Sequence, residues 1–132
     1  MCNWCHGAVG IGLARLGGYR IGDDRETEAE IECAVARAIE EPLSVRDHLC
    51  CGNFGRLELL FYAGSQLRRP RLIALARERA AMRLRETVRG FCWLIGTDAE
   101  NLGFFQGLAG IGYELLRLAE PNKIPCALLW QS

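Results

Sequence analysis

The hydrophobic and polar positions divide the chain into helical segments of two kinds. Segments of the first kind are amphipathic: residues 26–40 place Ile31, Val35 and Ile39 in one row, four residues apart. Residues 70–88 repeat this spacing with an apolar row made of Leu72, Ala76, Ala80, Leu84 and Val88. Apolar residues at this spacing predict helices that bury one face and expose the other. We therefore expect two outer helices.

Segments of the second kind begin with two glycines three residues apart and continue as an apolar stretch. They occur three times, at residues 7–16, 52–61 and 107–116. Glycine is expected in the first turn of a helix where a neighbouring backbone or a ligand crowds that turn. Residues 57–67 are apolar nearly all round, which predicts burial on most sides. We expect these segments to be inner helices.

The alternation of inner and outer helices predicts the fold class. Its period is about 50 residues, which describes either a solenoid or a closed α/α toroid. Since no run of alternating β-branched residues competes with this pattern, the sequence predicts an all-α fold. Three inner and two outer helices are too few to close a ring, so residues 1–132 are expected to form one domain, a partial α/α toroid. Pro121 and Pro125 should stop the last helix, and residues 126–130 should tuck against the body as a short apolar tail.

Charge and hydropathy exclude several classes of function. Sixteen basic and sixteen acidic residues cancel, so no net field favours nucleic acid or an anionic membrane. No apolar run approaches the roughly 20 residues needed to cross a bilayer, and no secretory signal precedes Cys2. We therefore expect a cytoplasmic protein without a membrane span. The arginines clustered between Arg68 and Arg89 are expected to form a solvated helix face.

The cysteines carry the candidate chemistry. Seven cysteines in a reducing compartment indicate metal ligands or small buried side chains, not a disulfide framework. Cys5, Cys50 and Cys51 lie just before two of the glycine turns, where a helix N-terminus lowers the pKa of a thiol. Thiolates favour zinc, and three protein ligands with an open fourth position are typical of a catalytic site. The competing interpretation is that these are ordinary buried cysteines of the core.

Two neighbouring residues leave alternatives open. Cys2 and Cys5 have the spacing of a structural zinc knuckle, so Cys2 could complete a closed four-sulfur site of architectural role only. His6 is expected either to act beside the metal, as an acid/base or an orienting group, or to be a structural histidine.

Four further residues are assigned no ligand role. His48 is expected to cap or pack, and Cys33 and Cys92 are expected to pack. Gln106 stands in the third glycine repeat where the first two carry His6 and Cys51, which suggests that its turn lines the same cavity.

At these residues the chain resembles the lanthionine synthetase C-like family, and most closely the C-terminal cyclase domain of class II lanthipeptide synthetases. Residues 4–7 resemble the first zinc motif of that family, and residues 49–53 resemble the Cys-Cys form of its second motif. Residues 103–112 are similar to the last glycine repeat, and residues 128–130 to the terminal tail.

The resemblance implies a function. It implies an α/α toroid with a central Zn²⁺ held by Cys5, Cys50 and Cys51, where a cysteine of a lanthipeptide precursor takes the fourth place. The bound thiolate would add to dehydroalanine or dehydrobutyrine and form a thioether ring. In the family an upstream Asp and a His of another glycine repeat contribute to cyclisation, and no position of this chain matches them. We therefore expect the zinc half of a cyclase domain, with the remainder of a synthetase as a partner. The alternative is a non-catalytic helical repeat module with a structural zinc.

Overall fold

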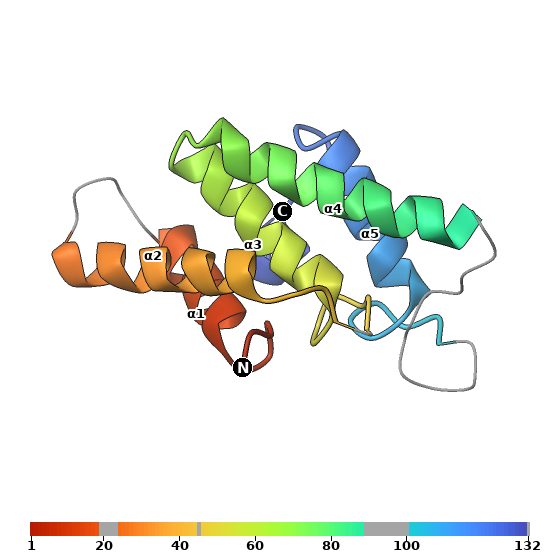
Figure 1. Ribbon diagram of the computed structural model, residues 1–132, viewed down its shortest axis with the longest axis horizontal. Coiled ribbons are helices and arrows are strands. Elements are labelled where there is room, and N and C mark those ends of the chain that lie inside the picture. Colours follow the sequence, from red (N-terminus) through yellow and green to blue (C-terminus); the bar gives the residue numbers. More distant parts are fainter. Residues whose placement is uncertain (19–23, 45, 89–100, 132) are drawn as a thin grey trace.

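Helices form nearly all of the regular structure in the computed structural model, which describes residues 1–18, 24–44, 46–88 and 101–131. The helices are α1 (Ala8–Gly18), α2 (Arg25–Glu40), α3 (Asn53–Gln66), α4 (Pro70–Val88), α5 (Leu108–Ala119) and the short 3-10 helix η1 (Ala127–Leu129) (Figure 1). In these ranges β-structure is limited to one isolated bridge between Cys2 and Gly7. The all-α prediction is confirmed.

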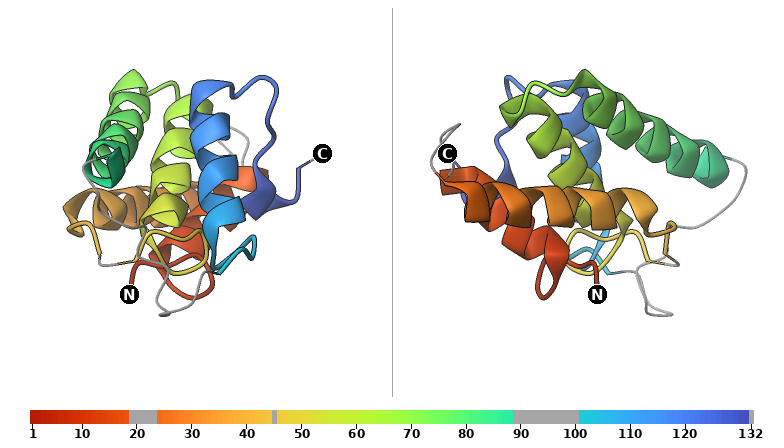
Figure 2. Two further views of the ribbon diagram at one scale, coloured as in Figure 1. Left: turned by 90° about the vertical axis from the view of Figure 1, so that its right-hand side faces the viewer. Right: turned by 60° about the vertical axis from the view of Figure 1, so that its left-hand side comes forward.

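The helices form an arc of alternating inner and outer elements. α1 packs against α2, and α3 packs against α4, so that each inner helix is followed by its outer helix. α3 also contacts α1 and α5, and Figure 2 shows it between α4 and α5. This arrangement is the partial α/α toroid expected from the repeat pattern. None of the helices in the described ranges is long and apolar enough to cross a membrane.

α3 is the centre of the hydrophobic core. Every residue from Asn53 to Gly64 is buried, which confirms the predicted burial of residues 57–67 up to Gly64, whereas Ser65 and Gln66 are exposed. Phe54, Leu57 and Leu60 have no exposed surface, and burying side chains of this size is the main source of favourable folding free energy. The helix therefore fixes where the loop before it, which carries Cys50 and Cys51, can lie.

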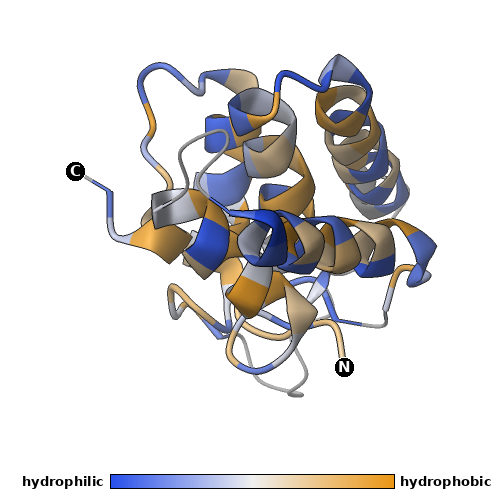
Figure 3. Ribbon diagram, turned by 90° about the vertical axis from the view of Figure 1, so that its left-hand side faces the viewer, coloured by the Kyte–Doolittle hydropathy of each residue, from blue (hydrophilic) through white to orange (hydrophobic). Residues whose placement is uncertain are grey.

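The outer helices bury one face, as expected, but in each of them one apolar residue that was predicted to be buried is exposed near the C-terminal end. On α2, where hydrophilic and hydrophobic residues alternate along the helix (Figure 3), Ile39 is 39% exposed and Ala38 is buried instead. On α4, Leu84 is 43% exposed, because the inward position is taken by Arg83. The predicted rows are correct up to Val35 and Ala80 and wrong at Ile39 and Leu84, and the side chain of Val88 lies outside the described part of the chain.

Several arginines of α4 are structural. Arg77 donates from Nε to the carbonyl of Leu118 at 2.9 Å, and Arg79 donates to the carbonyls of Ala38 and Ile39 at 3.0 and 2.7 Å. These carbonyls lie at the C-terminal ends of α5 and α2, where helical acceptors lack partners within the helix. The basic cluster is thus solvated only in part, because four of its described members bind groups of other elements: Arg69, Arg77, Arg79 and Arg83.

The C-terminal segment follows the expected course. α5 ends at Ala119, and Pro121 follows the end of the helix. Cys126 has no exposed surface and Leu128 has 3%, so the apolar tail packs against the body. The tail contacts α1 through η1, which brings the end of the chain close to its beginning.

Candidate metal centre

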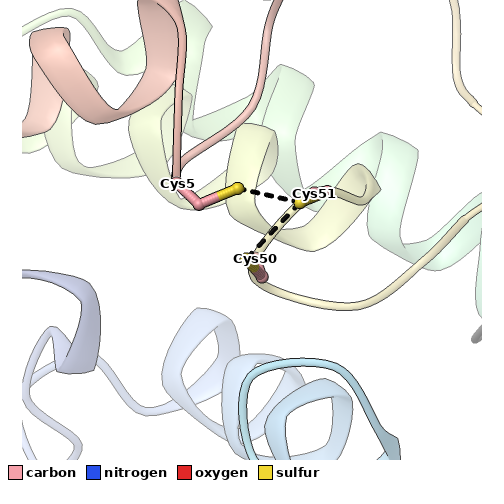
Figure 4. A group of neighbouring side chains, drawn as sticks. All are labelled: Cys5, Cys50 and Cys51. Carbon is pink, nitrogen blue, oxygen red and sulfur yellow. Dashed lines mark hydrogen bonds between the residues drawn. The ribbon is translucent and has the colours of Figure 1, made fainter.

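The three cysteines singled out by the sequence meet at one place in the structure (Figure 4). Cys5 comes from the loop before α1, and Cys50 and Cys51 come from the turn before α3. The Sγ atom of Cys51 lies 2.9 Å from that of Cys5 and 3.4 Å from that of Cys50. All three sulfur atoms lie within 4.8 Å of one another, as a shared metal ion requires.

Crowded glycines explain why three loops have the same geometry. A Cβ atom on Gly10 would lie 2.0 Å from the carbonyl oxygen of Trp4, and one on Gly55 would lie 2.1 Å from that of Leu49. In the third repeat a Cβ on Gly110 would lie 1.8 Å from the carbonyl oxygen of Phe104. Real side chains do not tolerate such contacts, so the second glycine of each repeat lets the preceding loop fold back over the first turn of its helix.

Backbone hydrogen bonds join the three loops to one another. The N–H of Trp4 donates to the carbonyl of Cys50 at 3.0 Å, and the N–H of Cys50 donates to the carbonyl of Phe105 at 2.9 Å. Each loop therefore fixes its neighbour, and the sulfur of Cys5 is held beside those of the Cys50–Cys51 pair by main-chain contacts that do not depend on the cysteine side chains.

The turn that carries Cys50 and Cys51 is also held from inside. His48 is 5% exposed, which is the packing role expected of it, and its Nδ1 accepts a hydrogen bond from the N–H of Cys51 at 3.2 Å within the turn, without capping α3. Asn53, which is fully buried, accepts from the N–H of Ser44 at 2.7 Å and donates to Asp47 Oδ1 at 2.7 Å.

Asp47 itself is bound by an arginine of α4. Arg83 donates to its two carboxylate oxygens at 2.9 and 2.6 Å, a bidentate pair in which Asp47 is completely buried. Hydrogen bonding by Asp47 raises the pKa of Arg83. Removing one partner of such a pair leaves a buried charge uncompensated, so the pair fixes the turn strongly.

The protonation of the three thiols differs. Burial, followed by hydrogen bonding to Cys5, raises the pKa of Cys51 to about 12 and raises that of Cys50 as well. Partial burial also acts to raise the pKa of Cys5. Hydrogen bonds from the other two thiols and from the N–H groups of Cys5 and His6 outweigh it, and the pKa of Cys5 falls below its ordinary value. The group thus favours one thiolate, Cys5, stabilised by two neutral thiols.

The sulfur group fits a zinc ion. Ligands at about 2.3 Å from a tetrahedral zinc lie about 3.8 Å apart, so small outward rotations of side chains now 2.9 and 3.4 Å apart suffice. Soft sulfur donors select zinc over the hard cations. Cys5 is exposed whereas Cys50 is 9% exposed, so the group is open on the Cys5 side.

The other candidates lie around this group. Among the described residues, Cys2 is not part of the sulfur group that could hold an ion; it is 5% exposed, in the bridge to Gly7. The closed four-sulfur alternative has no support in this arrangement. His6 is exposed and directly follows Cys5. Burial raises the pKa of Cys50, and the side chain of the exposed Gln106 acts against this shift, so the third loop reaches the sulfur group.

One of the two cysteines expected to pack does not. Cys33 is exposed on α2, because it lies on the face opposite the buried row of that helix. Cys92 lies outside the described residues.

An aromatic cluster beside the sulfur group was not anticipated from the sequence. The ring of Trp4 stacks on that of Phe105, with centroids 5.3 Å apart and planes at 3°. Phe105 also contacts Trp130 at 5.9 Å, and Trp4 Nε1 donates to the carbonyl of Leu128 at 3.3 Å. Only the sequence positions of these residues could have indicated that they lie near the sulfur group. Trp4 directly precedes Cys5, and Phe105 stands in the third repeat where the second carries Cys50.

A buried polar cluster between α3 and α5 was also missed. Arg117 Nε donates to Glu58 Oε2 at 2.8 Å, and Arg117 also donates to the carbonyl of Ile124. Within the described part of the chain, Oε1 of Glu58 and Oε1 of Glu114 have no hydrogen-bond partner. Burial, and then the carboxyl of Glu58, hold the pKa of Glu114 well above its usual range. Two acidic residues inside otherwise apolar helices were the signal for this cluster.

The sequence of the chain matches a known protein family. A family model described as "Lanthionine synthetase C-like protein" matches residues 2–129, which is almost the whole chain. No curated protein and no solved structure matches it.

Proposed function

Because the chain belongs to the lanthionine synthetase C-like family, we propose that it carries the zinc-binding half of a cytoplasmic lanthipeptide cyclase. The observation that carries the proposal is the convergence of three cysteine sulfurs from two loops, all within 4.8 Å of one another. Its substrate is a dehydrated precursor peptide, and the remainder of a synthetase would be its partner.

The ligands are Cys5, Cys50 and Cys51. Zinc bound there would supply a Lewis acid that keeps a thiol of the peptide deprotonated near neutral pH. The chain supports this role by holding its sulfurs on two joined loops and by leaving Cys5 exposed on one side. Since Cys5 is already the most acidic of the three thiols, it is the first that would offer a thiolate to the metal.

The proposed reaction is an addition. The sulfur of the peptide cysteine forms a bond to the β-carbon of dehydroalanine or dehydrobutyrine, while the carbon–carbon π bond breaks and its electrons move to the α-carbon. A proton then adds at the α-carbon. The net change is addition of S–H across a double bond, with no oxidation and no leaving group. His6, exposed next to Cys5, is the proposed proton donor.

The alternative, a non-catalytic helical module with a closed structural zinc site, needs Cys2 as a fourth ligand. The sulfur of Cys2 is outside the group, and burial raises the pKa of its thiol. An open, three-sulfur arrangement supports the cyclase more than the closed site.

Zinc content and thioether formation test the proposal. The purified protein should contain about one zinc per chain; Cys51→Ala should lose it, and Cys2→Ala and the exposed-cysteine control Cys33→Ala should keep it. Zinc lost on Cys2→Ala would support the closed site instead.

Activity is then measured on a dehydrated model peptide by mass spectrometry after alkylation of free thiols. The zinc-loaded protein should remove the alkylatable cysteine, and His6→Ala should slow this with zinc retained. A protein that contains no zinc when prepared under reducing, zinc-replete conditions would refute the proposal.

A further inference from the structure

An open cleft lies beside the sulfur group. Its volume is about 530 Å³, and Cys5 forms part of its wall. The other lining side chains are apolar or aromatic, chiefly Trp4, Leu13, Leu128, Leu129 and Trp130. Among the described residues that line the cleft there is no Asp, Glu, Lys or Arg, and Cys5 is the one side chain there that can ionise in the neutral pH range. A wall of this composition accepts apolar groups and makes it costly to strip water from a charged one.

Trp130 is placed for contact rather than for burial. It is 75% exposed, and its backbone is left-handed, with φ at 56°, a conformation that non-glycine residues rarely adopt. The N–H of Trp130 donates to the carbonyl of Ala127, which holds the residue at the end of η1. A large exposed aromatic ring on a constrained backbone supplies apolar contact area at little loss of side-chain freedom.

Trp4, the aromatic lining residue next to Cys5 in sequence, is held in place. Trp4 is fixed by its stacking on Phe105 and by the hydrogen bond from its Nε1 to Leu128. Phe105 in turn contacts the ring of Trp130, so one aromatic cluster builds both the cleft and the loop that bonds to Cys50.

The cleft and the candidate metal group share Cys5, so an occupant of one extends into the other. A peptide whose thiol approaches the three sulfurs has its neighbouring residue only about 3.8 Å further along the chain, measured between Cα atoms. The side chain of that residue is then within reach of the cleft lined by Trp4 and Trp130.

We infer that the cleft receives an apolar or aromatic side chain of the precursor peptide, adjacent in sequence to its reactive cysteine, and that Trp130 is the residue that selects it. This inference rests on the proposed function, because it takes the peptide thiol to be bound at the sulfur group. The preference is against acidic neighbours, since no cationic side chain stands among the described lining residues to compensate a carboxylate.

Three capped tetrapeptides test the inference: Ala-Cys-Phe-Ala, Ala-Cys-Asp-Ala and Ala-Ser-Phe-Ala. Binding is followed on the cobalt-substituted protein by the thiolate absorption bands of the metal and, in parallel, by calorimetry. The phenylalanine peptide should bind about tenfold more tightly than the aspartate peptide. The serine peptide should leave the cobalt spectrum unchanged.

Variants locate the preference. Trp130→Ala should weaken binding of the phenylalanine peptide about tenfold and leave that of the aspartate peptide unchanged, while Trp130→Phe should keep most of the preference. Because Trp130 is mostly exposed, its removal should not unfold the chain. Met82→Ala, on the exposed side of α4, is the matched control and should bind like the parent.

The possible failures are distinguishable. Equal affinity for the two cysteine peptides, or a preference that survives in Trp130→Ala, would overturn the inference while leaving thiol binding at the metal intact. If neither cysteine peptide changes the cobalt spectrum, both the proposed function and the inference built on it are wrong.

Discussion

The loop before α3 and the loop before α5 have the same backbone arrangement and different chemistry. In both, a carbonyl lies where the Cβ of a helical glycine would be, at 2.1 Å for Gly55 and 1.8 Å for Gly110. The first loop carries Cys50 and Cys51, and the second carries Phe105 and Gln106 at the equivalent positions. The backbone is thus a common support, and two side chains per loop decide what it does.

The two loops also differ in how they are fixed. Before α3 the fully buried Asp47 binds Arg83 and Asn53. Before α5 the loop relies on Asn101, which accepts from the N–H of Gly103 and donates to the carbonyl of Gln106. The sulfur-bearing loop therefore has the stronger internal support, which is what its proposed role as a source of metal ligands would require.

Adding a methyl group at either helical glycine should have the largest effect. Gly55→Ala and Gly110→Ala should each lower the free energy of unfolding by about 4 kcal/mol, because backbone atoms must move. Urea denaturation measures this. Gly112→Ala is the control: its Cβ would meet nothing within 4 Å, so we expect a gain of about 0.5 kcal/mol. A mild effect at only one of the first two sites would break the comparison.

Removing the support of the sulfur-bearing loop comes next. Arg83→Ala leaves Asp47 buried without its charge partner and should cost about 3 kcal/mol of unfolding free energy. Zinc affinity, measured by chelator competition, should fall with it. Arg85→Ala, an exposed arginine of the same helix, should change stability by less than about 0.5 kcal/mol. A similar loss in both variants would remove the special role of this pair.

Adding a cysteine to the loop before α5 tests whether its backbone can also present a sulfur to the metal. The side chain of Gln106 is close enough to Cys50 to act on the pKa of its thiol, so we expect Gln106→Cys to offer a fourth sulfur to the ion. Zinc should then bind about tenfold more tightly, and thioether formation should fall about 100-fold because the open position is closed. Gln106→Ser is the matched control and should retain both parent values. Unchanged activity in a variant with tighter zinc binding would argue against the open position.

The smallest effect concerns the buried carboxyl groups of Glu58 and Glu114, near the middle of α3 and α5. The raised pKa of Glu114 means that the folded state binds its proton more tightly than the unfolded chain. Its stabilising effect is complete below the ordinary value of 4.5 and is lost as the pH rises through the folded pKa. The groups around it are Glu58 and Arg117, and Cys126 lies next to Glu58.

Glu114→Gln should therefore flatten the decline of stability between pH 5 and pH 8. At neutral pH it should add about 1 kcal/mol, since the amide keeps the neutral shape and can donate to the unpartnered oxygen of Glu58. Thermal unfolding across this pH range measures the change. Glu120→Gln, at an exposed carboxylate, should leave the profile as it is.

The sequence specified the helices and the sulfur group better than the side chains around them. Helical periodicity and paired glycines are local signals, and they located α2, α3 and α5. The inward turn of Arg83 could not be foreseen, because its partner Asp47 is 36 residues away and lies in a loop.

The same limit applies to Trp4 and Phe105, whose stacking depends on the course of two loops that are 101 residues apart in sequence. Motif spacing pointed to Cys5, Cys50 and Cys51 as a group, and their assignment as ligands stays a prediction. Periodicity carried no information on which apolar side chains would face the cleft.

The hydrogen bonds from Trp4 to Cys50 and from Cys50 to Phe105 have a consequence for protein engineering. They involve only peptide groups, so the connection between the three loops does not depend on which side chains the loops carry. Substitutions at His6, Cys51 and Gln106 could therefore change the donor atoms without a change of backbone, and the same three loops would then offer those atoms to a different ion.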